Sequence, residues 1–417
     1  MSTEVQRRRH RAVGSAGPSR AGTQATDVVV VGGGIAGVLA AVRLAAGGAT
    51  VTLLERGALG SGATVGNHGI VHSGAMYAQH HTDILDHCQR AQMMVKEEFP
   101  DAVIGVFPAV YFGHADRVGA VTQALTRWGL DWTPTGPSTL AQHALPADTP
   151  AATVSETIVS SRQVLVDLVA RASALGVQIL PWVPVVELNR DHDRWLVGLP
   201  GGRNVAAGTV VLAAGEGNHR ILARLAPTAA DPVRSRLELM IYLPGYHPAG
   251  PVFCLDYGGP TIVPALGGAL VSLHGARRLD VDDRSGRPVP LARTNQLLAA
   301  ASGFPGLAGA LADAVAYTCV KTEWADDRAD RWGSRPEHAV VDHRDDGLPR
   351  LISVIPGKMT LAFHATRDLA QRILGHPVPL EPPRPAVDIS AFTATAASQV
   401  AVEPWRTRYT DQVVRAS

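Results

Sequence analysis

The segment 27–55 constrains the fold of this chain more than any other part of the sequence. It opens with the β-branched run 28–31, turns through the glycine-rich stretch 32–37, and continues into the small, apolar, helix-forming residues 38–46. A second apolar run, 49–54, follows the glycines that end the helical pattern. A strand, a glycine-rich turn, a helix and a second strand within about thirty residues predict a βαβ unit with parallel strands.

The glycines of this unit predict a dinucleotide site. Gly32, Gly34 and Gly37 have the spacing G-x-G-x-x-G. The first glycine permits a tight turn, the second lets a pyrophosphate approach the backbone, and the third lets helix and strand pack closely. The start of the helix offers N–H groups and a partial positive charge to the phosphates. Glu55 ends the second strand, where a carboxylate accepts hydrogen bonds from a ribose diol. The motif alone does not separate FAD from NAD.

Composition excludes several other classes of protein. The 417 residues include 38 Lys and Arg against 37 Asp and Glu, a formal net charge of +1. This balance leaves no concentrated basic face, so we expect no nucleic-acid partner. Cys88, Cys254 and Cys319 form no C-x-x-C pair, which is typical of a cytoplasmic protein without disulfides. The histidines just before Cys88 lack the further ligands of a familiar metal site, so we expect no metal.

The chain offers no obvious export or membrane segment. Residues 1–26 are basic and rich in Gly, Ser and Ala, and no apolar signal region follows them before the first strand, so we expect a disordered extension. The apolar stretch 28–46 is interrupted by glycines and by Arg43. We therefore expect no integral membrane segment.

Several motifs, taken together, resemble one family. The stretches 28–37, 54–56 and 60–64 (Gly-Ser-Gly-Ala-Thr) resemble the opening of the D-amino-acid-oxidase superfamily of FAD oxidoreductases. The stretch 66–77, Gly-Asn-His-Gly-Ile-Val-His-Ser-Gly-Ala-Met-Tyr, is similar to the N-S-G-V-I-H-x-G-x-x-Y segment of flavin-dependent glycerol-3-phosphate and L-2-hydroxyglutarate dehydrogenases. The stretch 210–217 resembles the family's second FAD segment. The carboxy-terminal G-x-R-P and G-G-K-L-T elements have counterparts in 333–336 and 356–360.

This resemblance implies FAD as the cofactor. No second G-x-G-x-x-G follows a strand, so we expect no built-in NAD(P)H site and an external electron acceptor: oxygen, a quinone or a carrier protein. The residues that the motifs and the resemblance place at the cofactor are Gly32, Gly34, Ile35, Ala36, Gly37, Glu55, Arg56, Thr64, Asn67, His68, Gly69, Val186, Ala214, Gly215, Gly357, Lys358, Met359 and Thr360.

The order of predicted elements gives the architecture. Helical periodicity at 164–175 continues the α/β pattern, whereas short strands broken by Gly and Pro fill 232–322. We expect an α/β (α+β, two-domain) fold: a Rossmann-like FAD-binding domain with an inserted antiparallel-sheet substrate domain. The expected bounds are 27–105, 151–231 and 333–376 for the FAD-binding domain, 106–150 and 232–332 for the substrate domain, and 377–417 for a proline-rich C-terminal tail.

Two residues are candidates for the chemistry at the flavin. His72 is the candidate base, because a neutral imidazole accepts protons near working pH. Two alternatives for His72 stay open: a covalent flavin tether, as a nearby histidine is in related amine dehydrogenases, and a buried structural histidine. Lys358 precedes the last predicted helix, where the resemblance places the flavin pyrimidine edge, and would add positive charge there. The alternative for Lys358 is a solvated surface lysine.

Other residues are candidates for substrate binding. The resemblance implies that Arg335 binds a carboxylate or phosphate, and an interdomain ion pair is the alternative. His68 stands where the dehydrogenases have serine, which changes the site. His274 lies on the inserted sheet that roofs the substrate in this family; an ordinary sheet histidine is the alternative. Lys321 supplies a further cation.

The predicted function is that of an FAD-dependent dehydrogenase or oxidase. It would oxidise a CH–OH group of a small polar substrate, such as a hydroxy acid, polyol or sugar-like compound, to a carbonyl by hydride transfer to flavin N5. One alternative is an FAD-dependent amine or amino-acid oxidase. The second alternative is a flavin-binding protein without turnover.

Overall fold

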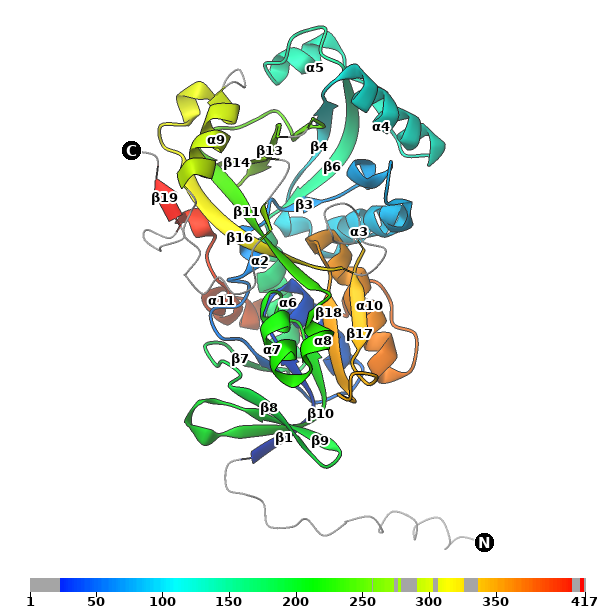
Figure 1. Ribbon diagram of the computed structural model, residues 1–417, viewed down its shortest axis with the longest axis vertical. Helices are drawn as coiled ribbons and strands as arrows, with labels where there is room; N and C mark the ends of the chain where they lie inside the picture. Colours follow the sequence, from blue (N-terminus) through cyan, green and yellow to red (C-terminus); the bar gives the residue numbers. More distant parts are fainter. Residues whose placement is uncertain are drawn as a thin grey trace, which may run out of the picture.

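The computed structural model describes residues 23–256, 258–273, 277–278, 291–302, 307–325, 337–406 and 413–415. Two sheets organise these residues, one in the lower and one in the upper half of Figure 1. The lower sheet has the strand order β17-β18-β10-β1-β2-β7, with the β8–β9 hairpin paired to β10. Its strands are β1 (Thr23–Val31), β2 (Val51–Leu54), β7 (Gln178–Leu180), β8 (Glu187–Asp191), β9 (Arg194–Gly198), β10 (Asn204–Leu212), β17 (Ala339–Asp342) and β18 (Leu351–Ile355).

The centre of the lower sheet is parallel, as the βαβ unit requires. β1 pairs in parallel with both β2 and β10, and β10 pairs in parallel with β18. β1 begins at Thr23 rather than at Asp27, because the residues from Thr23 to Thr26 pair with β10 and the Thr26 hydroxyl donates to the Thr50 carbonyl at 2.8 Å. These four residues were expected in the disordered extension, so that expectation was wrong for them; residues 1–22 lie outside the described residues.

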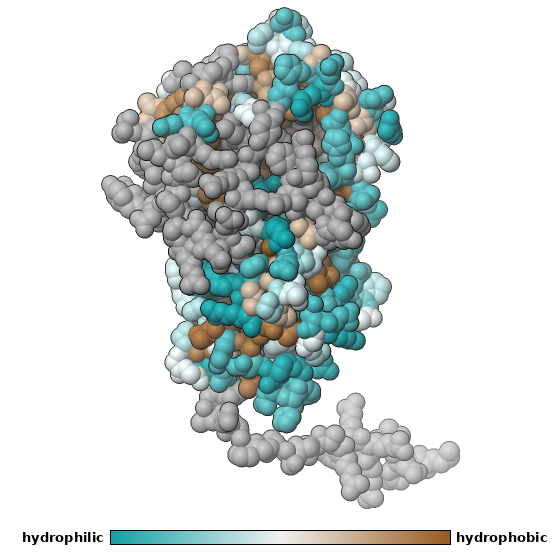
Figure 2. Space-filling model, in the orientation of Figure 1, coloured by the Kyte–Doolittle hydropathy of each residue, from teal (hydrophilic) through white to brown (hydrophobic). Residues whose placement is uncertain are grey.

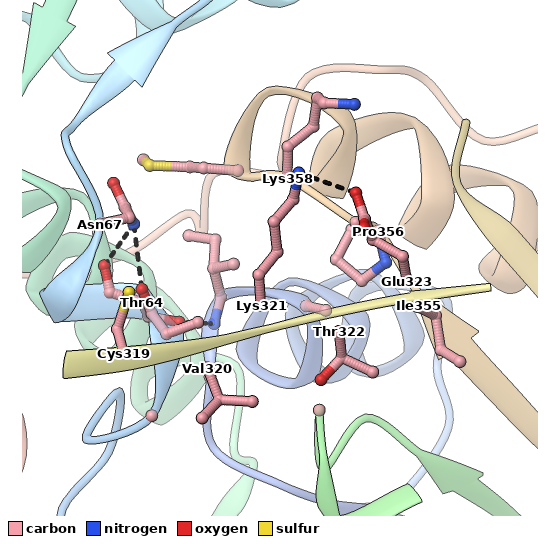
Figure 3. A pocket seen from close by; sticks show the side chains of 18 of the residues that line it. Thr64, Asn67, Cys319, Val320, Lys321, Thr322, Glu323, Ile355, Pro356 and Lys358 are labelled. Atoms are coloured by element: carbon pink, nitrogen blue, oxygen red, sulfur yellow. Dashed lines mark hydrogen bonds and ion pairs between the residues drawn. The ribbon is translucent and has the colours of Figure 1, made fainter. Parts of the chain in front are cut away.

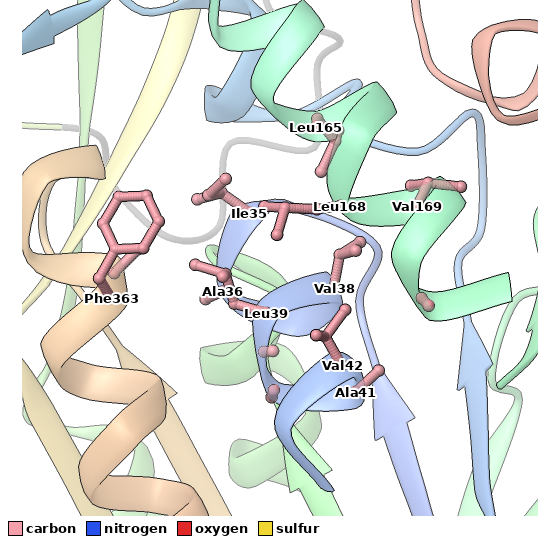
Figure 4. Close-up of a cluster of buried hydrophobic side chains, with 14 of the residues drawn as sticks. Ile35, Ala36, Val38, Leu39, Ala41, Val42, Leu165, Leu168, Val169 and Phe363 are labelled. Carbon is pink, nitrogen blue, oxygen red and sulfur yellow. The ribbon is translucent and has the colours of Figure 1, made fainter. Parts of the chain in front are cut away.

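Three helices pack together beside this sheet and form a large apolar core. They are α1 (Ile35–Ala46), α6 (Ser161–Ala174) and α10 (Met359–Leu374). Figure 4 shows Leu39 of α1, Leu165 of α6 and Phe363 of α10 meeting in this core, and all three are fully buried. Because α1 and α10 are locked by the same core, their amino-terminal ends are held in fixed positions.

The upper sheet is built mainly from antiparallel pairs and has the order β19-β16-β11-β14-β13-β12-β4-β6-β3. One pair, β4 with β12, is parallel. β5 and β15 attach to β6 and β11. The strands are β3 (Ile70–Val71), β4 (Val103–Phe112), β5 (Thr133–Pro134), β6 (Ala151–Val159), β11 (Val233–Pro244), β12 (Val252–Cys254), β13 (Pro260–Ala265), β14 (Gly268–Leu273), β15 (Arg277–Arg278), β16 (Val315–Trp324) and β19 (Val413–Arg415).

The expected domain bounds differ from the sheet membership at one place. We placed 151–231 in the FAD-binding domain, but β6 belongs to the upper sheet, where it pairs with β4 along most of its length. The alternation of exposed and buried residues in β6 fits either kind of strand, so only the pairing partner decides. β3 also lies in the upper sheet, so the chain crosses between the two sheets more often than expected.

Further helices connect and cover these sheets. Their bounds are α2 (Ala63–Gly66), α3 (Leu85–Glu98), α4 (Ala115–Arg127), α5 (Pro137–Gln142), α7 (Gly217–Leu225), α8 (Pro227–Ala230), α9 (Leu291–Ser302) and α11 (Ser390–Gln399). Single turns of 3₁₀ helix are η1 (Ala75–Tyr77), η2 (Thr82–Ile84), η3 (Pro100–Ala102), η4 (Pro200–Gly202), η5 (Ala308–Ala310) and η6 (Pro404–Arg406).

The carboxy-terminal residues that the structure describes are packed on the molecule and do not form a loose tail. α11 contacts α6, and Val400 forms a bridge with Leu59. The buried Arg43 donates to carbonyl oxygens of the proline-rich stretch 379–381. β19 pairs with β16 of the upper sheet. The described residues of the expected proline-rich tail, 377–406 and 413–415, therefore contact both halves of the molecule.

None of the helices in the described residues is both long enough and apolar enough to span a membrane. On the face drawn in Figure 2, hydrophilic residues dominate the lower half, with hydrophobic atoms gathered between them.

Candidate active site

One large cavity joins the two sheets. It has a volume of about 1540 Å³ and runs from the amino-terminal end of α1 to residues of β12 and α4. Ligand pockets commonly measure about 300–1,000 Å³. The cavity therefore has room for a dinucleotide together with a second small molecule.

The glycine-rich turn forms one end of the cavity. Gly32 has φ +110°, and a Cβ there would lie 2.5 Å from the Ala213 carbonyl oxygen of the neighbouring strand connection. A Cβ on Gly37 would overlap the Gly32 carbonyl oxygen, so the third glycine is needed for the helix to pack. Gly34, Ile35 and Ala36 line the cavity, which brings the helix amino terminus to its wall.

Glu55 is held firmly at this end. One carboxylate oxygen accepts the Gly33 N–H at 2.7 Å and the other accepts the Gly57 N–H at 2.9 Å. Both oxygens keep further lone pairs for a ribose diol. Arg56 forms an ion pair with Glu216 at 2.8 Å, and both residues line the cavity. A carboxylate oriented by two backbone donors fits the role that the sequence predicted for Glu55.

The loop after β2 is fastened by its own side chains. The Thr64 hydroxyl accepts the Ile35 N–H at 3.0 Å. The Asn67 amide nitrogen donates to the Thr64 carbonyl at 2.6 Å, and its oxygen accepts from the Gly69 N–H at 2.6 Å and the Ser161 hydroxyl at 3.0 Å. Because these bonds use both ends of the amide, Asn67 acts here as a clamp on the loop, although its side chain also lines the cavity.

The second predicted FAD segment is positioned by a residue that the sequence analysis missed. Asn218, fully buried in α7, accepts the Ala214 N–H at 2.8 Å and donates to the Leu212 carbonyl at 3.1 Å. These bonds shape the turn after β10 so that Ala214 and Gly215 line the cavity. An asparagine a few residues beyond a strand end is a recognisable turn signal, but its partners could not be assigned without the fold.

His72 lies at the junction of the two sheets. Its backbone N–H donates to the hydroxyl of the buried Thr360 at 3.0 Å, and its ring meets the Tyr77 ring edge-on at 5.2 Å. Its Nδ1 is buried and makes no hydrogen bond within the described residues. Burial, followed by the positive charges of Lys358 and Lys321, lowers the pKa of His72 to about 3. The imidazole is therefore neutral, with a buried ring nitrogen available to a ligand.

His68 is hydrogen-bonded to a strand of the upper sheet. Its Nε2 lies 2.7 Å from the Ser272 hydroxyl of β14. Burial lowers the pKa of His68 to about 4, although Glu238 acts in the opposite direction. His68 thus contributes a neutral, hydrogen-bonded ring rather than a charge.

A cluster of cations faces these two histidines. Lys321 and Lys358 lie side by side in the cavity, close to Glu323 (Figure 3). Glu323 accepts Lys321 Nζ at 2.7 Å and Arg236 Nη2 at 3.2 Å, and Arg236 also pairs with Glu238 at 3.2 Å. Burial alone would raise the pKa of Glu323, but Lys321 and Arg236 together lower it to about 2. The Lys358 ammonium lies 4.5 Å from the centre of the Tyr77 ring.

Lys358 is the titratable cation of this cluster. Burial first, and then the charge of Lys321, lower its pKa to about 7. Lys321, Lys358 and Arg236 bring three cations together in the cavity lining, with Glu323, Glu238 and Glu337 as the nearby carboxylates. Such a group of cations can bind an anion. The sequence singled out Lys358 and Lys321 but gave no signal for Arg236, Glu238 or Glu323, which meet only through the β11–β16 pairing.

Most predicted cofactor residues converge on the cavity. Those that line it are Gly32, Gly34, Ile35, Ala36, Glu55, Arg56, Thr64, Asn67, His68, Val186, Ala214, Gly215, Gly357, Lys358 and Met359. Gly37, Gly69 and Thr360 lie behind this wall: Gly37 packs α1 on the sheet, Gly69 turns the loop with φ +71°, and Thr360 holds His72.

Two predicted substrate residues, Arg335 and His274, lie outside the described residues. Among the described residues, no three His, Cys, Asp or Glu side chains are arranged to hold a metal ion. Two other histidine pairs involve residues of α10. His87 stacks on His364 at 4.1 Å between ring centres, and His338 pairs with Asp368 at 2.9 Å.

Fold and site together define a class of protein: a nucleotide-dependent oxidoreductase with its reaction cavity between a Rossmann-like sheet and a largely antiparallel sheet. Residues 27–350 match the family model described as FAD dependent oxidoreductase (DAO), and the chain belongs to this family. It is an enzyme that uses FAD. The cavity suits this cofactor, since the glycine turn, the α1 amino terminus and the Glu55 carboxylate offer the donors and acceptors that a pyrophosphate and a ribose need.

Curated relatives share short segments with the chain. A probable FAD-dependent oxidoreductase of Pseudomonas aeruginosa is 47% identical over 55 residues, which cover 13% of this chain and 14% of the relative. One component of the anaerobic glycerol-3-phosphate dehydrogenase of Haemophilus influenzae is 38% identical over 72 residues, covering 17% of this chain and 13% of the relative. The matches span well under two thirds of these relatives, so they do not carry over a whole activity.

Solved structures share the whole fold. Glycine oxidase from Geobacillus kaustophilus superposes with a TM-score of 0.66 at 18% identity, covering 88% of this chain and 98% of that one. L-α-glycerophosphate oxidase from Mycoplasma pneumoniae, with FAD bound, gives a TM-score of 0.68 at 16% identity, covering 86% and 98%. At these identities the likeness shows the fold alone, and the substrate class stays open between alcohols and amines.

Proposed function

We propose that this enzyme oxidises a CH–OH group of a small anionic substrate, such as a hydroxy acid or a polyol or sugar phosphate, to a carbonyl. The observation that carries the proposal is the cluster of Lys321, Lys358 and Arg236 facing the neutral His72 inside the cavity. When bound, FAD supplies the acceptor for the hydride. The electrons then leave for an external acceptor, which is oxygen, a quinone or a carrier protein.

The first task of the protein side chains is to bind and orient the anion. Lys321 and Lys358 offer ammonium donors from β16 and from the start of α10, so a carboxylate or phosphate can be held from two sides. Arg335 joins this role in the proposal. Orientation matters because the reacting C–H must be presented in one direction only.

The second task is to take the hydroxyl proton. His72 is neutral and has a buried Nδ1 without a protein partner in the described part of the chain. Burial is the main cause of the low pKa of His72, and a bound anion beside Lys358 and Lys321 offsets the positive charges that lower it further. The imidazole therefore becomes a better acceptor when the substrate arrives. Thr360 holds the His72 backbone and so fixes the ring's position.

Amine or amino-acid oxidation is the second candidate, because the fold is shared with glycine oxidase. The charges of the cavity weigh against it. A substrate ammonium would enter beside Lys321 and Lys358, while Glu323 is already neutralised by Lys321 and Arg236. Like charges at close range in a partly dry site repel.

Anaerobic reduction of the bound flavin separates these two candidates. We expect 2-hydroxy acids or glycerol phosphate to bleach the flavin absorbance and the amino acids of the same carbon skeleton to leave it unchanged. The His72→Asn variant should keep its FAD but bleach at least about a hundredfold more slowly, the usual range for loss of a general base. Bleaching by amino acids alone would contradict the proposal, and equal rates in the variant would remove His72 as the base.

A covalent tether at His72 is tested on the same protein. After acid precipitation we expect the yellow colour in the supernatant, since a base must keep its ring nitrogen free. Flavin that stays in the pellet of the native enzyme, but not of His72→Asn, would make His72 the tether instead.

A further inference from the structure

The cavity continues past the cation cluster into the upper half of the molecule. Beyond His72 and Lys321 its lining includes Met76 of η1, Val121 of α4, and Phe253 and Leu255 at β12. We call these four residues the apolar lobe. None of them belongs to the glycine turn, to the Glu55 region or to the start of α10. The lobe is therefore a part of the cavity lining separate from the residues that we assign to the nucleotide.

The lobe is the open face of a packed core. Phe253 and Val121 are 1% and 5% exposed, and Met76 and Leu255 pack against the same cluster of buried side chains. The Phe253 ring stacks on Tyr111 at 4.6 Å between ring centres. Since these side chains are supported from behind, the wall is pre-formed, and ordering it costs a ligand little free energy.

Polar side chains also line this part of the cavity, among them Thr261 of β13, whose strand neighbours are Phe253 and Ser272. Arg117 pairs with Asp256 at 3.4 Å, and His80 is exposed beside the opening. The described lining thus holds cations at Lys321 and Lys358 and apolar carbon at the four lobe residues, with polar side chains beside them. A site with a charged end and an apolar end fits a molecule with the same two ends.

We propose that the apolar lobe binds the side chain of the substrate, which is a 2-hydroxy acid carrying an aromatic or branched apolar group. This inference rests on the proposed oxidation of a CH–OH group and narrows its substrate class. The carboxylate lies at Lys321 and Lys358, the carbinol carbon lies near His72, and the apolar group fills the lobe. A short or fully polar hydroxy acid leaves the apolar lobe in contact with water, so it binds without the contribution of apolar burial.

Binding of unreactive carboxylates tests the lobe without turnover. Phenylacetate and acetate are titrated into the FAD-loaded enzyme, and their dissociation constants are taken from the perturbation of the flavin absorption spectrum. We expect phenylacetate to bind at least about tenfold more tightly, since each added methylene in an apolar pocket is worth roughly tenfold or more. Equal dissociation constants would overturn the proposal.

Substitutions in the lobe test whether the phenyl group of phenylacetate binds there. Val121→Phe fills the lobe and should weaken phenylacetate about tenfold while changing acetate less than about twofold. The matched control is Val106→Phe, because Val106 is 50% exposed and does not line the cavity. Leu255→Thr, a milder change, should also weaken phenylacetate selectively, and it serves if Val121→Phe does not fold. A variant that weakens both carboxylates equally would contradict a separate lobe.

Turnover separates failure of the lobe from failure of the proposed function. Anaerobic bleaching is compared for lactate, 3-phenyllactate and phenylalanine. Faster bleaching by 3-phenyllactate than by lactate supports both proposals. Equal bleaching by lactate and 3-phenyllactate overturns the lobe but leaves CH–OH oxidation standing. Bleaching by phenylalanine alone, with tight phenylacetate binding, overturns CH–OH oxidation and leaves the lobe standing.

Discussion

Lys358 titrates inside the working range of pH, because burial and the neighbouring Lys321 lower its pKa to about 7. Below that pH its ammonium attracts the substrate anion, and above it the attraction is lost. We expect the KM for an anionic hydroxy acid to rise as pH increases through 7. In Lys358→Met the KM should be raised roughly tenfold at low pH, the worth of one charged hydrogen bond. The KM of this variant should not rise further as pH increases through 7. Initial rates measured at several pH values around 7 give the KM of the native enzyme and of the variant. A flat KM profile in the native enzyme would contradict the assignment.

Glu156 is a fully buried carboxylate beside the active-site loop. One oxygen accepts the Ser73 and Tyr111 hydroxyls, each at 2.7 Å, and the other accepts the Ser73 N–H at 2.8 Å and Gln92 Nε2 at 3.2 Å. Burial raises its pKa to about 7, against the lowering effect of the bonds from Ser73 and Tyr111. The folded protein therefore binds this proton more tightly than the unfolded chain does.

The raised pKa of Glu156 makes the folded protein less stable as pH increases. Between the ordinary pKa of 4.5 and about 7, folding takes up a proton, so the free energy of unfolding falls as pH rises through this window by about 3 kcal/mol. Glu156→Gln should remove that dependence, because an amide can donate to the two hydroxyls and accept from the two N–H donors. Denaturant unfolding at several pH values measures the slope. An unchanged slope in the variant would show that Glu156 stays ionised.

At the residue scale, the candidates that sequence reasoning could name are the groups that carry their own local signal. Glu55 is marked by its distance from the glycine turn, and Lys358 by its place before a helix. Arg236 and Glu156 carry no such mark, because each acts through partners that the fold brings to it, such as Glu323 for Arg236. Only the folded arrangement brings those partners together.

The contact between α1 and its strand depends on a single missing side chain. A Cβ at Gly37 would overlap the Gly32 carbonyl, so Gly37→Ala must push the helix off the turn. We expect loss of FAD and destabilisation by about 3 kcal/mol, as for other overpacked sites. The control is Gly119→Ala in α4, where an added Cβ meets nothing within 4 Å and should stabilise by about 0.5–1 kcal/mol. Thermal unfolding and flavin content measure both variants, and retained FAD in Gly37→Ala would contradict the packing argument.

At the element scale, the βαβ unit was predictable because turn, helix and strands are all local. The sheet to which β6 belongs was not predictable, because the alternation of its residues does not reveal the strand it pairs with. That strand is β4. The start of β1 was also set from outside, since β10 extends far enough to pair with Thr23. Elements whose ends depend on a distant strand are therefore the ones that sequence reasoning misplaced.

Arg43 ties three parts of the molecule together. It is 1% exposed, and its guanidinium donates to the Thr366 hydroxyl of α10 at 3.2 Å and to the Pro379 carbonyl at 2.7 Å. Arg43→Met should cost about 3 kcal/mol by leaving buried acceptors unpaired. It should also speed proteolysis within 377–389. Arg90→Met is the control, since Arg90 pairs with Asp86 on the surface and should change stability by less than about 0.5 kcal/mol. Equal proteolysis of both variants would contradict this role.

For the whole molecule, the two-sheet architecture and the FAD cofactor followed from motifs in the right order along the chain, and the family assignment confirms both. The packing of the proline-rich C-terminal segment could not be predicted, because it depends on its proline carbonyls accepting from the distant Arg43 and Arg171. The substrate could not be deduced from the motifs. In our proposal it depends on the cation cluster and the apolar lobe, whose residues come from elements far apart in the sequence.

The oxidation of an alcohol carbon beside the cation cluster is tested most directly by anaerobic reduction of the enzyme with a 2-hydroxy acid that carries hydrogen or deuterium at carbon 2. We predict that the flavin absorbance bleaches, that deuterium slows the bleaching, and that the corresponding amino acid leaves the spectrum unchanged. Bleaching by the amino acid, with none by the hydroxy acid, would contradict the proposed oxidation and assign the cavity to amine oxidation.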